Sequence, residues 1–536
     1  MAATAAAPSL IKGGTAQDKP NIIYILCDDL GYGDLACYGH PEIKTPHLNN
    51  LVTEGVKLTE NYAAAPVCSP ARAGFLTGRT PNRSGIYDHL GSTYFRAAGI
   101  DYPHLSPKEI TIAELLKEVG YTTSIVGKWH LDDHFDDLNG ESMPDIQGFD
   151  YYMATKNNAK DSHANPHNFV RNGVPLDRID GYSNDIIVDE CIDWMSNTRD
   201  NAKPFFLFCS FHSPHEPVAT PDEYKNMYST GEENKDIYYG NVTHLDAAVG
   251  RLLEYLDNNN LRDNTFVMFT SDNGPETLLR YGNGAARSYG TSGDFSCQKL
   301  SLYEGGIRVP GIARWPGVID PGTESSEPIC GIDMLPTFCA MTGAQVPGDR
   351  WIDGSNALAA FHNRQVTRHQ PLFWKYYRGE SCDDHPEDQD GNKPKIVLRD
   401  GDWKLCVNND YRHTKLYNLA NDPNETTNLV DQEQQRVTEM MTILQEISED
   451  VKTEGENGEP IIRTVSSLRS GAPRFAIKNV NSIEIFSMTG KRMAHFTTKE
   501  QEINLKAYNL PRGLYTLRIN HRHNQVVSSL ANVRIK

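Results

Sequence analysis

Four short apolar runs lie in the first half of the chain, at residues 22–26, 122–126, 205–211 and 265–269. The runs lack the apolar–polar alternation of a strand with one exposed face, which is typical of strands buried on both faces of a parallel sheet. Between them, residues 110–120 and 243–259 carry apolar side chains at helical spacing. This order predicts an α/β fold with a large central, mostly parallel mixed sheet flanked by helices.

The pattern changes after residue 365. Residues 366–452 are typical of short strands and turns followed by a polar helix, which predicts a smaller α+β C-terminal subdomain. Residues 453–474 begin with an acidic, glycine-rich stretch and are interpreted as a linker. Residues 475–536 contain short alternating strands joined by Gly and Pro, which predicts a small all-β tail module. Residues 1–19 lack the parts of a secretory signal and are interpreted as the remnant of a leader or cloning sequence.

The composition narrows the possible functions. The 536 residues are 38% hydrophobic, enough for a large core, which excludes global disorder. With 52 Lys and Arg against 70 Asp and Glu, the formal net charge is −18, which argues against a nucleic-acid partner. No run approaches the ~18 consecutive apolar residues of a membrane span, so no transmembrane segment is expected. Ten cysteines without CxxC pairs indicate neither a zinc knuckle nor a disulfide-rich scaffold, and Cys27 and Cys209 are predicted to be core residues.

Polar residues follow all four apolar runs directly. In chain order they are Asp28 and Asp29, then Lys128 and His130, then His212 and His215, and finally Asp272 and Asn273. In open α/β sheets, ligands bind in the crevice outside the carboxyl ends of the strands. We therefore expect these side chains to share one crevice. Polar loop composition explains one or two such endings but not four.

The segment PVCSPARAGFLTGR, residues 66–79, carries the sharpest local signal. Cys68 precedes Pro70, and proline in a first helical turn presets the backbone, so Cys68 is predicted to lie at a helix N-terminus. Such a terminus favours an anion, and Arg72 lies one turn further on with a planar fork of donors. The pattern indicates an oxyanion site with a soft nucleophile, although a buried cysteine before a helix is the plainer alternative.

CSPAR followed by LTGR resembles the signature of the type I sulfatases of the alkaline-phosphatase-like superfamily, whose cysteine is oxidised to Cα-formylglycine. Further segments are similar to the family's motifs in the same order, namely NIIYILCDDLGYGDL, GKWHL, HSPHEP, FTSDNG, KLSLYEGGIRVP, RDGDWKL and LYNLANDPNETTNL. The resemblance spans roughly residues 20–430. It implies a sulfatase catalytic domain at residues 20–365 and a C-terminal sulfatase subdomain at residues 366–452.

The resemblance also assigns a metal site. It places Asp28, Asp29, Asp272 and Asn273 around a calcium ion. Three carboxylates and one amide are oxygen ligands, which suit a hard cation rather than zinc. Magnesium takes the same ligand types but prefers a tighter octahedral arrangement with its own waters.

By the same resemblance, Cys68 as formylglycine hydrate is the nucleophile. One hydroxyl of the geminal diol attacks sulfur, and deprotonation of the other later expels sulfate. Lys128 and Lys299 are expected to hold the sulfate oxygens, and Arg72 to support the formylglycine.

Histidines are the proton-transfer candidates, because their pKa lies nearest neutrality. The resemblance implies that His215 protonates the leaving sugar oxygen and that His130 hydrogen-bonds the diol. His212 is the weaker candidate and is predicted to be structural.

The tail from about residue 475 resembles the sorting domain that Bacteroidetes use for type IX secretion, in IFSMTGK and LPRGLYTLRI. This implies a secreted or cell-surface protein, with the periplasm as the alternative, and the type IX machinery as a partner. A carbohydrate-binding module is the other interpretation of this tail. It would need exposed aromatic residues, for which Tyr508 and Tyr515 are the candidates.

The sequence thus predicts a hydrolase of sulfate esters on a sulfated polysaccharide or oligosaccharide, matured by a formylglycine-generating enzyme. Two alternatives stay open: a phosphomonoester or phosphonate hydrolase of the same superfamily, and a non-catalytic glycan-binding protein. Substrate specificity is expected in the loops 88–106, 154–182 and 276–298, without assignment to single residues. The acidic turn DDHFDD, residues 132–137, either shapes the substrate rim or is a solvated loop.

Overall fold

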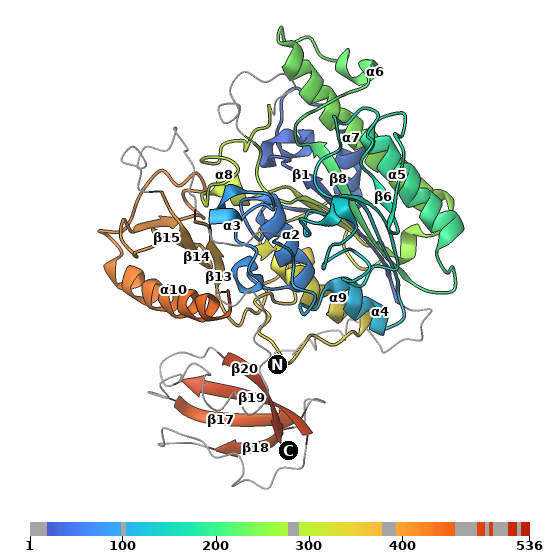
Figure 1. Ribbon diagram of the computed structural model, residues 1–536. Coiled ribbons are helices and arrows are strands. Elements are labelled where there is room, and N and C mark those ends of the chain that lie inside the picture. Colours follow the sequence, from blue (N-terminus) through green and yellow to red (C-terminus); the bar gives the residue numbers. More distant parts are fainter. Residues whose placement is uncertain are drawn as a thin grey trace, which may run out of the picture. The chain divides into compact units, whose positions relative to one another are not determined.

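The computed structural model describes residues 19–97, 103–276, 289–377 and 393–455, together with four tail strands. Its largest element is a mixed sheet of ten strands in the order β11-β2-β10-β9-β1-β8-β4-β5-β6-β7 (Figure 1). The strands are β1 Asn21–Asp28, β2 Val56–Leu58, β4 Thr122–Lys128, β5 Tyr151–Thr155, β6 Val170–Arg171, β7 Val174–Pro175, β8 Phe205–Pro214, β9 Thr265–Ser271, β10 Gly311–Arg314 and β11 Thr323–Ser325.

The four predicted apolar runs are β1, β4, β8 and β9, and they lie next to one another in the centre of this sheet. All pairings among them, and that of β4 with β5, are parallel. The antiparallel pairs lie further out, where β10 joins β9 and β2 and where β6 joins β5 and β7. The predicted α/β class with a mixed sheet is confirmed.

Ten helices are present in the described residues. They are α1 Pro46–Glu54, α2 Cys68–Thr77, α3 Thr93–Ala97, α4 Ile112–Glu118, α5 Ser183–Asp193, α6 Asp222–Lys225, α7 Glu233–Asn258, α8 Glu304–Ile307, α9 Met334–Thr342 and α10 Gln434–Gly455. The helix predicted at 243–259 begins ten residues earlier, at Glu233. Gly240 and Asn241 interrupt the apolar spacing there, although Tyr238 and Val242 are buried.

Helices cover both faces of the central strands. Ile22 and Leu26 of β1 belong to an apolar cluster that includes side chains of α2, α4 and α9. Ile23 and Cys27 point the other way, into a cluster with α1, α5 and α7. Cys209 of β8 is fully buried in that second cluster, so the prediction of core cysteines is confirmed. The absence of alternation in the sequence follows from burial on two faces.

A second sheet is antiparallel, with strands β13 Leu372–Lys375, β14 Ile396–Asp400, β15 Trp403–Val407 and β16 Lys415–Asn418. Helix α10 lies along this sheet (Figure 1), and its Met440 and Leu444 belong to the apolar cluster between them. A pair of two-residue strands, β3 Asn61–Tyr62 and β12 Ile329–Cys330, completes this part of the fold. Helix α10 continues to Gly455, three residues into the predicted linker.

A buried group of charges connects α8 to the second sheet. Lys404 of β15 places its Nζ 2.8 Å from a carboxylate oxygen of Glu304 in α8 and 2.8 Å from one of Glu425. Glu304 also accepts hydrogen bonds from Tyr62 Oη over 2.6 Å and from Arg308 Nη1 over 3.2 Å. We call these five residues the α8 cluster.

The tail forms its own antiparallel sheet in the order β18-β17-β19-β20. Its strands are β17 Val480–Ser487, β18 Arg492–Phe496, β19 Gly513–His521 and β20 Val527–Ile535, so the predicted all-β character is present. Tyr515 belongs to β19, whereas Tyr508, residues 1–18 and most of the predicted linker lie outside the described residues. Among the helices described, none is both long and apolar enough to cross a membrane.

Candidate active site

The carboxyl ends of the four central strands meet at one buried cluster of polar side chains. Cys68 Sγ, one carboxylate oxygen each from Asp28 and Asp29, and one ring nitrogen of His215 all lie within 4.8 Å of one another. Cys68 is the first residue of α2, with Pro70 in the first turn, as the sequence predicts. The structure therefore brings the predicted nucleophile, two predicted metal ligands and the predicted acid together.

The four predicted metal ligands form one connected group. Asn273 Nδ2 donates to Asp29 Oδ1 over 2.7 Å, and the backbone N–H of Asp29 donates to Asp272 Oδ1 over 3.3 Å. Asp28, Asp29, Asp272 and Asn273 are each at most 2% exposed. Asn273 Oδ1 is buried and finds no hydrogen-bond partner among the described residues. A free amide oxygen beside three carboxylates is the donor set that a hard cation takes, so these residues fit calcium.

Each of the three carboxylates also has a lysine or arginine as its nearest basic partner. The pairs are Lys128 Nζ with Asp28 Oδ2 at 2.5 Å, Lys299 Nζ with Asp29 Oδ2 at 2.6 Å, and Arg72 Nη2 with Asp272 Oδ2 at 2.8 Å. The two lysines predicted to hold sulfate therefore come from opposite sides of the crevice, one from the end of β4 and one from the segment before α8. All six side chains are buried, which strengthens their electrostatic interactions relative to water.

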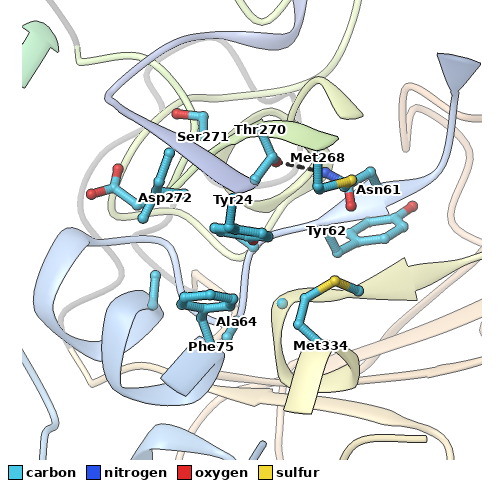
Figure 2. A pocket seen from close by; sticks show the side chains of 14 residues that line it. Tyr24, Asn61, Tyr62, Ala64, Phe75, Met268, Thr270, Ser271, Asp272 and Met334 are labelled. Carbon is cyan, nitrogen blue, oxygen red and sulfur yellow. Dashed lines mark hydrogen bonds between the residues drawn. The ribbon is translucent and has the colours of Figure 1, made fainter. Parts of the chain in front are cut away.

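Burial affects the carboxylates unequally. It raises the pKa of Asp272 to about 7, and the negative charge of Asp28 adds to the effect. Figure 2 shows Asp272 beside Tyr24 and Phe75, which line the same pocket. Burial also acts to raise the pKa of Asp28, but the positive charge of Lys128, together with His215, Arg72 and Lys299, holds that pKa well below its usual value. A divalent cation would supply the positive charge that keeps all three carboxylates ionised.

The thiol of Cys68 is 2% exposed, and Sγ donates to Asp28 Oδ1 over 3.3 Å. Burial, followed by the charge of Asp28, raises the pKa of the thiol well above its usual value. Since the thiolate is the nucleophilic form of cysteine, this environment disfavours an unmodified Cys68 as the nucleophile.

Arg72 is fully buried, and its guanidinium donates hydrogen bonds to groups on or next to three strands. Nε and Nη2 donate to Asp272 Oδ2 over 3.0 and 2.8 Å. Nη1 donates to the carbonyl oxygen of Lys128 over 2.9 Å and to Ser210 Oγ over 2.6 Å. The donor fork, predicted to serve the residue at position 68, is thus directed at β9, β4 and β8.

The three histidines have different surroundings. His215 Nε2 lies 3.5 Å from Asp29 Oδ2, and burial, with Lys299 next, lowers the pKa of this imidazole. His130 is 3% exposed, and neither of its ring nitrogens has a partner among the described residues. Its pKa is well below the usual value because of burial and the nearby Lys128. His212 Nε2 lies 2.8 Å from Thr155 Oγ1, which agrees with its predicted structural role.

The backbone is strained at several of these positions. Asp29 and His130 have φ of 64° and 57°, in the left-handed region that non-glycine residues rarely adopt. Leu300, directly after Lys299, has φ of 70°. Strain of this kind costs about 1–3 kcal/mol per residue and concentrates at functional sites.

Sequence reasoning missed several residues that contact this cluster, among them Asn158 and Ser210 as well as Glu216 and Glu276, which lie 3.5 Å from His215 and 3.6 Å from Lys299. Asn158 follows β5, and its side chain reaches both Lys128 and His215. Ser210 of β8 accepts from Arg72 and donates to the carbonyl oxygen of Lys128 over 2.7 Å. The apolar run at 151–155, with polar residues directly after it, is the signal that would have identified Asn158 as another strand-end residue.

The acidic turn at 132–137 is attached to the segment after β5. Asp133 pairs with Lys156 over 2.8 Å, and Asp136 pairs with Lys160 over 3.2 Å. Asp132 is buried and accepts from the backbone N–H groups of His134 and Ser142 over 2.7 and 2.6 Å. The turn is therefore an ordered, ion-paired structure rather than a freely solvated loop.

Comparisons with known proteins agree with this geometry. Residues 20–344 match the Sulfatase family, residues 293–453 match the C-terminal part of N-sulphoglucosamine sulphohydrolase, and residues 467–531 match the secretion system C-terminal sorting domain. Fold, site and matches together define a sulfuric ester hydrolase. The chain belongs to the sulfatase family.

Two curated relatives illustrate the similarity. The chain is 34% identical to N-acetylgalactosamine-6-sulfatase of Canis lupus familiaris over 388 residues, covering 68% of this chain and 70% of the relative. It is also 34% identical to steryl-sulfatase of Rattus norvegicus over 435 residues, covering 66% of this chain and 72% of the relative. These names cover a sugar sulfate and a sterol sulfate, so family membership leaves the substrate open.

Two solved structures share the fold. The crystal structure of Ps i-CgsB in complex with k-i-k-neocarrahexaose superposes with a TM-score of 0.70 at 27% identity, covering 84% of this chain and 97% of that one. The phosphonate monoester hydrolase of Agrobacterium radiobacter superposes with a TM-score of 0.55 at 18% identity, covering 90% of this chain and all of that one. The fold alone therefore does not separate sulfate from phosphonate chemistry.

Proposed function

We propose that this protein is an exported, calcium-dependent sulfatase that removes O-sulfate from a sulfated polysaccharide or oligosaccharide. The observation that carries the proposal is the grouping of Cys68 Sγ, Asp28, Asp29 and His215 within 4.8 Å at the strand ends. The raised pKa of the unmodified thiol supports oxidation of Cys68 to formylglycine, whose hydrate supplies a hydroxyl nucleophile and a route for expelling sulfate.

The metal assignment rests on the donor set. Asp28, Asp29, Asp272 and Asn273 would hold the calcium ion, which polarises the sulfate group when bound. The chain's own basic residues then divide the remaining work. Lys128 and Lys299 would exchange their carboxylate contacts in part for sulfate oxygens.

Two histidines are assigned to the proton transfers. His215 would protonate the leaving oxygen, because Nε2 faces the crevice beside Asp29. His130, with both ring nitrogens unpartnered in the described residues, is suited to hydrogen-bond the hydrate of residue 68. Arg72 would act indirectly by holding Asp272 and the end of β4 in place.

The choice of a glycan substrate is supported by relatives. One curated relative is named for a sulfated amino sugar, and one solved structure holds a neocarrahexaose. The match to a secretion sorting domain supports a secreted or cell-surface location, with type IX machinery as partner and the periplasm as the alternative. We also propose a catalytic domain at 20–365, a C-terminal subdomain at 366–452, a linker at 453–474 and a sorting domain at 475–536, with a formylglycine-generating enzyme as maturation partner.

The first test is peptide mass spectrometry across Cys68, on protein from the medium of its native host. An aldehyde in place of the thiol is expected. An unmodified thiol throughout the secreted protein would contradict the proposed nucleophile and favour the non-catalytic glycan-binding alternative.

The second test compares the sulfate and phosphate esters of one phenol, followed by a panel of sulfated oligosaccharides. Turnover of the sulfate ester should exceed that of the phosphate ester. Preference for phosphate would favour the phosphomonoester or phosphonate hydrolase alternative instead.

A further inference from the structure

Asn158 lies beside the candidate active site, in the segment that follows β5. Its side-chain amide touches groups from two different strands. Asn158 Oδ1 lies 3.4 Å from Lys128 Nζ, beyond the end of β4. Asn158 Nδ2 lies 2.9 Å from His215 Nδ1 and 3.0 Å from the carbonyl oxygen of Glu216, beyond the end of β8. One half-buried amide thus bridges the proposed sulfate-binding lysine and the proposed acid.

The orientation of this amide is determined by its neighbours. An ammonium group only donates hydrogen bonds, so the oxygen of Asn158 must face Lys128. The NH₂ group consequently faces His215 and the carbonyl oxygen of Glu216. The reverse orientation would set the NH₂ group against the ammonium of Lys128 and the amide oxygen against the carbonyl oxygen of Glu216. The NH₂ group therefore donates to that carbonyl oxygen and packs against the Nδ1 edge of His215.

The contacts of Asn158 determine which edge of the imidazole faces the crevice. His215 Nδ1 lies 2.7 Å from the carbonyl oxygen of Glu216, which accepts a proton carried on Nδ1. Asn158 donates to the same carbonyl and closes the Nδ1 edge against rotation. The opposite nitrogen, Nε2, is left 3.5 Å from Asp29 Oδ2, on the side of the proposed metal and nucleophile.

We propose that Asn158 is a positioning residue that holds the His215 ring with Nε2 directed at the leaving oxygen. In that step an oxygen of the hydrate at position 68 bonds to sulfur and releases its proton to water, while the old sulfur–oxygen bond gives its electron pair to the leaving oxygen. The Nε2–H bond of the imidazolium breaks as the new oxygen–hydrogen bond forms. His215 becomes neutral and keeps its Nδ1 proton, which stays hydrogen-bonded to the carbonyl oxygen of Glu216. This inference rests on the proposed function, because it concerns the acid of the same site.

The test uses the full chain and aryl sulfates that differ in leaving group. Leaving groups that depart easily need little protonation, whereas poor ones depend on the acid. Asn158→Leu should lower kcat/KM for 4-methoxyphenyl sulfate by about 10- to 100-fold and that for 4-nitrophenyl sulfate by less than about 3-fold. An equal loss on both esters would indicate a general structural defect and overturn the inference.

Asn168→Ala is the matched control, since Asn168 Nδ2 supports the same segment through the carbonyl oxygen of Asn158 over 2.9 Å without touching His215. Any loss in this variant should be the same for both esters. His215→Ala provides the benchmark, and adding Asn158→Leu to it should have little further effect on the poor leaving group, because the two changes act through one ring. Full additivity of the two losses would contradict the proposal.

Failure of the proposed function is distinguishable. If the wild-type protein hydrolyses no sulfate ester, the sulfatase assignment for this site fails, whatever the variants do. Asn158 is then still tested by the crystal structure of Asn158→Leu, in which the His215 ring should rotate and Nε2 should move away from Asp29. An unchanged ring would overturn the positioning role even without turnover.

Discussion

Two buried groups of acids and bases lie in this protein, and they differ in how completely their polar atoms are paired. In the α8 cluster, Lys404 lies between Glu304 and Glu425, and both oxygens of Glu304 have partners. In the active-site cluster, Asn273 Oδ1 and both ring nitrogens of His130 lack partners among the described residues.

The pKa values do not follow this difference, because each cluster holds one acid with a lowered pKa, Glu304 or Asp28, and one with a pKa raised to about 7, Glu425 or Asp272. Lys404 and Arg308 outweigh the effect of burial on Glu304 and hold its pKa at about 2. Burial raises the pKa of Asp272 to about 7 although Arg72 contacts it. The pairing therefore distinguishes the two clusters, because a paired cluster stabilises the fold, whereas an incompletely paired one is prepared for a ligand that the chain does not supply.

The largest expected effect is on sulfate-ester turnover, and it should occur in the active-site cluster and not in the apolar core. Cys68→Ala should reduce turnover of a sulfate ester at least about 1,000-fold, because it removes the proposed nucleophile. Cys209→Ala, which changes a fully buried core cysteine, is the control. It should keep its turnover and lose about 1 kcal/mol of unfolding free energy. Equal activity losses in both variants would refute a special role for Cys68.

The next effect is on stability. Lys404→Met leaves two buried glutamates without their shared cation and should lower the unfolding free energy by about 3–5 kcal/mol. Lys128→Met should cost less, because it removes the ion-pair partner of one carboxylate, Asp28, whereas Lys404 is shared by two, but it should abolish most turnover. Chemical denaturation and ester hydrolysis on both variants check the comparison. A larger stability loss in the Lys128 variant would reverse our assignment of the two clusters.

Removal of calcium should affect the active-site cluster and leave the α8 cluster unchanged. Exhaustive chelation is expected to abolish activity and to lower the unfolding temperature. Restoring the ion at about 1,000 times its dissociation constant should return about 4 kcal/mol. Asp272→Asn removes one proposed ligand and should make the unfolding temperature insensitive to chelator. Activity that survives chelation would show that the metal assignment is wrong.

The last effect appears only as a pH dependence and concerns Asp34, a buried carboxylate that accepts hydrogen bonds from the N–H groups of Gly31 and Thr291 and from Tyr238 Oη, over 2.7, 2.8 and 2.9 Å. Burial raises its pKa to about 7. The folded state therefore binds this proton more tightly than the unfolded state does.

Stability linked to Asp34 is thus fully present below pH 4 and is lost as the pH rises towards 7, by at most about 1.4 kcal/mol per pH unit. Asp34→Asn should flatten that slope in unfolding measurements between pH 4 and 8. An unchanged slope would show that Asp34 ionises normally.

The sequence predicted those parts of the fold and of the site that are determined by residues adjacent in the chain. The runs that became β1, β4, β8 and β9, the helix start at Cys68, and the strand-end residues were all predictable, because burial on two faces and polar strand ends leave marks in adjacent residues.

Contacts over long sequence separations were not predictable. Lys404 and Glu304 lie 100 residues apart, and nothing local to either residue indicates that they pair. Asn158 could have been recognised as a strand-end residue, but its contacts with Lys128 and His215 depend on where β5 lies in the sheet. The guanidinium of Arg72 was expected beside the nucleophile, but its orientation towards Asp272 depends on tertiary packing.

The burial of Cys68 also limits when this residue can be oxidised relative to folding. A residue that is 2% exposed at the start of a packed helix offers no room for the catalytic groups of another protein. If Cys68 becomes formylglycine, its oxidation belongs to the period before α2 docks on the sheet. A chain that folds before this oxidation would keep an unmodified Cys68 and stay inactive. The yield of active enzyme would therefore depend on the relative rates of folding and modification.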